Sequence, residues 1–105
     1  MHVGRGYYVS NLNFVHAYDF SDRGTKVLGQ VFTPAFEETT KPIRVEMTLT
    51  AFDRDLRVLG HTELDFYSVP ASGALLPFEA RLFDVPLSAI ACVSIAPKGA
   101  WVVRD

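Results

Sequence analysis

The sequence predicts an all-β fold, namely an antiparallel sandwich of two sheets built from six to seven strands. Two observations predict this class: apolar and polar residues alternate along several segments, and turn-forming residues recur about every ten residues. No helix of two turns or more is supported by the sequence, and the segment around Glu37-Glu38 lacks apolar periodicity. A strand with one apolar face must bury that face against a second layer. A sandwich is therefore expected, and an open barrel is the alternative.

The clearest element is a hairpin that runs from Ile43 to Leu64. Odd-numbered residues are apolar and even-numbered residues are polar from Ile43 to Ala51, so the odd ones are expected to face the core of a central strand. Asp53-Arg54-Asp55 interrupts the alternation and predicts a turn, in which the Asp53 carboxylate accepts hydrogen bonds from turn amides. Alternation resumes from Val58 to Asp65 and predicts the partner strand.

Two strands are expected before this hairpin, over residues 7–18 and 26–32, because both segments are rich in aromatic and β-branched residues. Turn formers at residues 19–24 separate them. Pro34 and Pro42 bracket a polar segment that predicts a loop, since proline cannot donate a hydrogen bond to a sheet.

Three strands are expected after the hairpin. Residues 70–74 have the composition of a loop, and alternation over 78–83 predicts the fifth strand. Residues 87–96 are almost all small or apolar, which predicts a sixth strand that is central and covered on both faces. Pro97-Lys98-Gly99 predicts a further turn, and residues 101–103 predict a short seventh strand.

Four segments between Lys26 and Ile95 follow a recognisable order, namely Val27-Leu28-Gly29-Gln30-Val31, Val45 to Asp53, Val58-Leu59-Gly60 and Leu76-Pro77-Phe78-Glu79. In this order they resemble the FxLYD-type bacterial immunoglobulin-like β-sandwich domains. The resemblance implies an immunoglobulin-like sandwich that acts as a non-catalytic envelope or accessory module, and it supplies no active-site residues. The chain departs from the family pattern at Leu49 and Ala51, where an aromatic residue and a leucine are expected.

Length and composition indicate one domain over residues 1–105, with 49% hydrophobic and 21% charged residues, a balance typical of a folded globular protein. The formal net charge is −2 and the basic residues are scattered, so no nucleic-acid partner is expected. The longest apolar run is too short to span a membrane, and the N-terminal residues lack the order of a secretion signal, so a soluble chain without membrane insertion is expected. The only cysteine, Cys92, cannot form an internal disulfide.

Candidate chemical sites are few, and no catalytic residue, cofactor or metal is expected. His61, Glu63 and Asp65 alternate and would share one strand face, but a solvated polar face explains them better than a metal site. The Asp53 turn lacks the glycine and the final glutamate of a calcium loop. Cys92 lies in the most apolar segment, which predicts an inert packing group.

Aromatic residues are the remaining lead to function. Neighbours in an extended strand face opposite ways, so one residue of each aromatic pair must be exposed or meet a partner. We expect a non-catalytic protein-interaction or structural accessory module, self-associating as a homodimer or adding a partner strand at edges that carry no charge. A small carbohydrate-binding module is the alternative. The candidate interface residues are Tyr7, Tyr8, Phe66, Tyr67, Trp101 and Val102.

Overall fold

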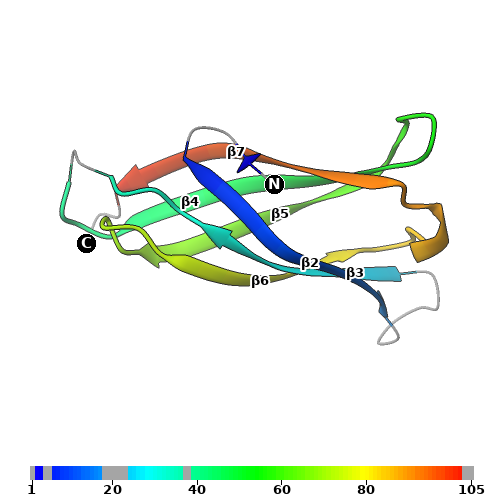
Figure 1. Ribbon diagram of the computed structural model, residues 1–105, viewed down its shortest axis with the longest axis horizontal. Coiled ribbons are helices and arrows are strands. Elements are labelled where there is room, and N and C mark those ends of the chain that lie inside the picture. The colour runs from blue at the N-terminus through cyan, green and yellow to red at the C-terminus, as the bar shows by residue number, and fades with distance from the viewer. Residues whose placement is uncertain (1, 4–5, 18–23, 37–38, 103–105) are drawn as a thin grey trace.

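The computed structural model of the chain describes residues 2–3, 6–17, 24–36 and 39–102 (Figure 1). Its strands form two antiparallel sheets, with the orders β1-β2-β3-β6 and β5-β4-β7, and the predicted all-β sandwich is therefore confirmed. The strands are β1 (His2–Val3), β2 (Tyr7–Ala17), β3 (Gly24–Phe32), β4 (Ile43–Phe52), β5 (Val58–Val69), β6 (Leu75–Leu82) and β7 (Cys92–Val102), with a 3₁₀ turn, η1, at Leu87–Ala89.

Strand β4 is the centre of its sheet, as predicted, because β5 pairs with one of its edges and β7 with the other. Its odd-numbered residues from Ile43 to Ala51 are all buried, while the even-numbered residues between them are only partly covered. These odd side chains pack against Val27 and Val31 of β3 in the opposite sheet and form the middle of the core. The predicted faces of this strand are confirmed.

The hairpin of β4 and β5 is also confirmed, since Phe52 pairs with Val58 across the turn. One carboxylate oxygen of Asp53 accepts hydrogen bonds from the amides of Asp55 and Arg57, at 2.8 and 2.9 Å. The side chain thus satisfies backbone donors that the turn leaves without a partner in the sheets, which is why aspartate suits this position.

Strand β2 changes its inward face part-way along. Tyr7 and Val9 are buried, whereas beyond the bulge between Ser10 and Asn13 it is Leu12 and Phe14 that pack against the core. Asn11, at the bulge, has a φ of 54°, a conformation that asparagine tolerates better than most residues. Two short alternating runs of opposite phase therefore make one strand.

The prediction of a central sixth strand over residues 87–96 is wrong. Residues 87–89 form η1, and β7 begins at Cys92 as an edge strand that pairs with β4 alone among the described residues. Only Ile95 of this strand is buried, and the thiol-bearing Cys92 is exposed rather than packed inside. Small apolar residues fit an uncovered edge as readily as a covered centre, so composition did not distinguish the two.

The predicted turn at Pro97-Lys98-Gly99 and the separate seventh strand after it are wrong as well. Strand β7 continues to Val102, with Lys98 as the extra residue of a bulge opposite Glu46 and Met47 of β4. Proline is tolerated because β7 lies at a sheet edge, where a residue whose nitrogen faces outward needs no hydrogen-bond donor.

The ends of the sandwich differ in what they carry. The β4–β5 turn and η1 lie at one end, and the loops at residues 33–42 and 70–74 lie at the other, on the right and left of Figure 1. The backbone of these two loops is joined where the amide of Phe36 donates to the carbonyl of Ala71. Predictions for Tyr18, for residues 19–23, for the 37–38 part of the loop and for Val103 lie outside the described residues.

Leu49→Ala should lower the free energy of unfolding by about 3 kcal/mol, because Leu49 is fully buried and its loss leaves a cavity between the sheets. Thr50→Ala is the matched control on the outer face of the same strand and should cost less than about 1 kcal/mol. Urea denaturation measures both. Equal losses in the two variants would contradict the assigned faces of β4.

Candidate interaction surface

Three side chains form a row across the outer face of the β5-β4-β7 sheet. Arg44 lies on β4 directly opposite Trp101 of β7, and Tyr67 lies on the other neighbouring strand, β5. Tyr67 and Trp101 are 64% and 49% exposed, so the row ends in an accessible ring on each side. We call Tyr67, Arg44 and Trp101 the aromatic–arginine row.

A bulge in β7 and plain alternation in β5 place the two aromatic rings on this outer face. On β7, Ile95 faces the core, so simple alternation would turn Trp101 inward as well, but the extra residue Lys98 reverses the phase. On β5, Leu64 and Phe66 face the core, so alternation turns Tyr67 outward, beside Arg44. The three side chains therefore come together through the pairing of residues between neighbouring strands, which composition alone does not predict.

Arg44 is held in place by acidic and aromatic neighbours. Its Nε and one terminal nitrogen donate to the two carboxylate oxygens of Asp65 at 3.1 and 2.9 Å. A terminal nitrogen also lies 2.8 Å from a carboxylate oxygen of Glu46, and the guanidinium stands 4.7 Å from the centre of the Tyr67 ring. A forked pair of this kind fixes the orientation of an arginine better than a single contact does.

The ionisation of the group reflects these contacts. The hydrogen bond from Arg44 holds the pKa of the Asp65 carboxyl below its ordinary value. The hydrogen bond with Asp65 raises the pKa of the Tyr67 hydroxyl above its ordinary value, since that bond needs the proton. At neutral pH the row therefore presents a charged guanidinium and a neutral phenol beside the ionised carboxylate of Asp65.

The indole of Trp101 lies close to Gly99. A Cβ atom built on Gly99 would come within 2.7 Å of the indole ring, so a side chain at this position would push the ring away. Gly99 pairs with Glu46, which places the indole on the same outer face as the carboxylates. The close approach leaves the opposite face of the ring to solvent or to a partner.

A second exposed apolar row crosses the outer face of the other sheet. Tyr8 pairs with Phe32, and Phe32 pairs with Leu75, and the three are 53%, 45% and 46% exposed. Phe32 and Leu75 were missed by sequence reasoning, because only their cross-strand register brings them next to Tyr8. Both rows lie toward the end of the sandwich that carries the loops at residues 33–42 and 70–74.

The candidate interface residues divide into two groups. Tyr8, Tyr67, Trp101 and Val102 are exposed, whereas Tyr7 is a core residue and Phe66 is half-buried against the core. Each aromatic pair therefore sends one ring inward, as the alternation of a strand requires. Tyr7 does not belong to an exposed surface, and burial raises the pKa of its hydroxyl.

The polar face of β5 engages β4. Glu63 accepts a hydrogen bond from the Thr48 hydroxyl, and Asp65 forms an ion pair with Arg44, so both carboxylates bind side chains of β4. Within the described ranges, no group of three His, Cys, Asp or Glu residues is placed to hold a metal ion.

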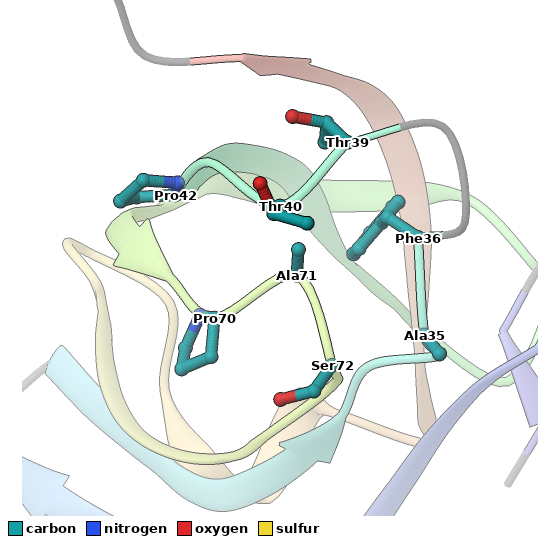
Figure 2. A pocket seen from close by; sticks show the side chains of 8 residues that line it. All are labelled: Ala35, Phe36, Thr39, Thr40, Pro42, Pro70, Ala71 and Ser72. Atoms are coloured by element: carbon teal, nitrogen blue, oxygen red, sulfur yellow. The ribbon is translucent and has the colours of Figure 1, made fainter.

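An open hollow of about 570 Å³ lies at the loop end of the sandwich (Figure 2). Phe36 and Ala71 point into it from its two walls, and the hydroxyls of Thr40 and Ser72 lie near its rim. The described residues that line it carry no charge, and the Thr39 hydroxyl accepts a hydrogen bond from the amide of Lys41. These described residues do not supply the convergent polar groups that a specific small-molecule site needs.

Comparisons with protein-family models, with curated proteins and with solved structures find no match. In the part of the chain that the structure describes, no helix is long and apolar enough to cross a membrane.

The Asp65 carboxyl should titrate below the ordinary value of 3.8 in the folded protein. Arg44→Gln should raise this pKa, because it removes the charge that stabilises the carboxylate, whereas Arg54→Gln in the distant turn should not. Because the pKa of Asp65 is lower in the folded than in the unfolded chain, the pair stabilises the fold at pH values above the pKa of the unfolded chain. This stabilisation is lost as the pH falls through the pKa of the folded chain. Carboxyl titration by NMR measures the shift, and an unchanged pKa in Arg44→Gln would contradict the pairing.

Proposed function

We propose that this chain is a non-catalytic protein-interaction module and that the aromatic–arginine row is its binding surface. The observation that carries the proposal is the alignment of two exposed rings around an arginine that Asp65 and Glu46 already hold in place. Tryptophan, tyrosine and arginine are the residues most enriched among those that dominate binding energy at protein interfaces. Arg44 loses little freedom on binding because its orientation is fixed beforehand.

The strand order supports an accessory module of the immunoglobulin type. Sheets β2-β3-β6 and β5-β4-β7 have the connectivity of the A-B-E and C′-C-F strands of that arrangement. The resemblance of four segments to FxLYD-type domains points to the same class. Either a second copy of the chain or a different protein can supply the complementary surface.

A carbohydrate-binding module is the second candidate, and the same row favours it. An exposed indole close to the sheet surface offers a ring on which a sugar can stack, and the carboxylate of Glu46 lies on the neighbouring strand, with that of Asp65 one strand further, as hydrogen-bond acceptors. The protein-interaction proposal is preferred because those carboxylates are already occupied by Arg44, which leaves them fewer free positions for hydroxyl groups.

Trp101→Ala should abolish self-association or weaken binding of a protein partner at least about tenfold, because it removes one end of the row. Leu56→Ala is the control, since Leu56 is 71% exposed in the β4–β5 turn at the other end of the sandwich. Sedimentation over a wide concentration range measures self-association, and co-precipitation from an extract of the source cells measures binding of another protein.

Titrating the protein with a panel of glycans while the fluorescence of its single tryptophan is recorded distinguishes carbohydrate binding from protein interaction. A glycan-dependent shift without any protein association would favour carbohydrate binding. Equal protein association in Trp101→Ala and Leu56→Ala would contradict the proposed surface.

A further inference from the structure

The sheet edges of this sandwich are protected unequally. The edge strand β6 carries Pro77 and the charged residues Glu79 and Arg81, and the edge strand β5 carries His61, Glu63 and Asp65. These are the features by which proteins discourage the addition of further strands. Strand β7 has no charged residue from Cys92 to Ala96, and within the described ranges it pairs only with β4.

An apolar cleft lies beside this unprotected edge. Leu12 and Phe14 of β2 form one wall, and Leu87 with the segment Ile90–Val93 forms the other, around a volume of about 410 Å³. No charged residue lines it, and Leu12, Phe14 and Ile90 are only partly buried. The two sheets thus leave apolar side chains incompletely covered between β2 and the first half of β7.

The short strand β1 covers another part of the same side. It pairs with Tyr7 and Tyr8 of β2 and contacts β7 (Figure 1). Because β1 meets β2 only at Tyr7 and Tyr8, it lies away from Leu12 and Phe14. The cleft therefore remains open beside Cys92 and Val93, and the charge-free edge that continues from there to Ala96 brings the length of Cys92–Ala96 to about 17 Å in extended chain.

Pro97 fixes which backbone groups of the edge point outward. It has no N–H to offer β4, and in an antiparallel strand both polar backbone groups of one residue point to the same side. The backbone of Pro97 therefore points away from β4, toward the free edge of the sheet. Alternation places the backbone N–H and C=O of Ile95 and Val93 at the same free edge. Their amides and carbonyls are ready to pair with one more strand.

We propose that the Cys92–Ala96 edge of β7 binds an extended segment of another protein by strand addition. The segment is uncharged over about five residues, and its apolar side chains at alternate positions enter the cleft between β2 and β7. The absence of charge in the lining selects such a segment, because burying an unpaired charge there would carry a large desolvation penalty.

A symmetric pairing of β7 with β7 of a second copy fits the cleft poorly. In that arrangement the second copy would present Val93 and Ile95 on the inner face, and Ile95 is already buried in its own core. Ser94 and Ala96, whose side chains lie on the outer face of the sheet, are too small to fill the cleft between β2 and β7. A different segment with larger side chains satisfies both the edge and the cleft.

This edge is separate from the aromatic–arginine row, so the two proposals fail independently. The probe is a set of synthetic peptides about seven residues long, with threonine at outer positions and every combination of Val, Ile, Leu and Phe at inner positions. Binding is measured by fluorescence polarisation of labelled peptides. Amide exchange followed by NMR then reports whether Val93 and Ile95 become protected.

At least one peptide should bind and slow exchange at Val93 and Ile95 at least about tenfold, while the same peptide with serine at its inner positions should not. Ala91→Glu, which places a charge at the cleft, should weaken binding at least about tenfold. Ser88→Glu, an exposed position on η1 outside the cleft lining, should leave binding within about twofold.

Three results would overturn the proposal. They are the absence of binding by every peptide, equal binding of Ala91→Glu and Ser88→Glu, and protection of Val93 and Ile95 by self-association without peptide. Trp101→Ala should bind the peptides like the unmodified protein, which separates this edge from the surface proposed above.

Discussion

The one-sided burial of β4 is the constraint on which the rest of the structure depends. Its odd-numbered residues from Ile43 to Ala51 are between 0% and 3% exposed, and the strand is paired on both edges. A shift of this strand by a single residue would move every one of these side chains to solvent. The register of β5 and β7, and hence the position of everything on the outer face, follows from that of β4.

The same alternation that builds the core also builds the candidate surface. Arg44 and Glu46 lie between buried residues of β4, so their side chains must point away from the core. Alternation along β5 adds Tyr67 to the same face, and the bulge in β7 adds Trp101. The interaction surface is thus rigidly supported, because it shares its backbone with the best-buried strand of the described protein.

The hairpin of β4 and β5 was predictable because local alternation and a turn-forming aspartate gave the same answer. The position of β7 was not predictable, because a run of small apolar residues is compatible with a covered centre and with a bare edge. The placement of Trp101 depends on the bulge at Lys98, and the exposed row of Tyr8, Phe32 and Leu75 depends on pairing between strands. Sequence reasoning found exposed aromatics as a class, but the neighbours of each ring come from long-range register.

The central claim is that β4 is the doubly paired centre of its sheet and that the first half of β7 is an uncovered edge. Amide hydrogen exchange of the protein alone, resolved residue by residue by NMR, tests it most directly. We predict that amides of β4 are among the slowest to exchange, and that Ser94 and Ala96 are protected while Val93 and Ile95 exchange freely. Protection of Val93 and Ile95 equal to that of Ser94 and Ala96 would contradict the account, because another strand would then already cover this edge.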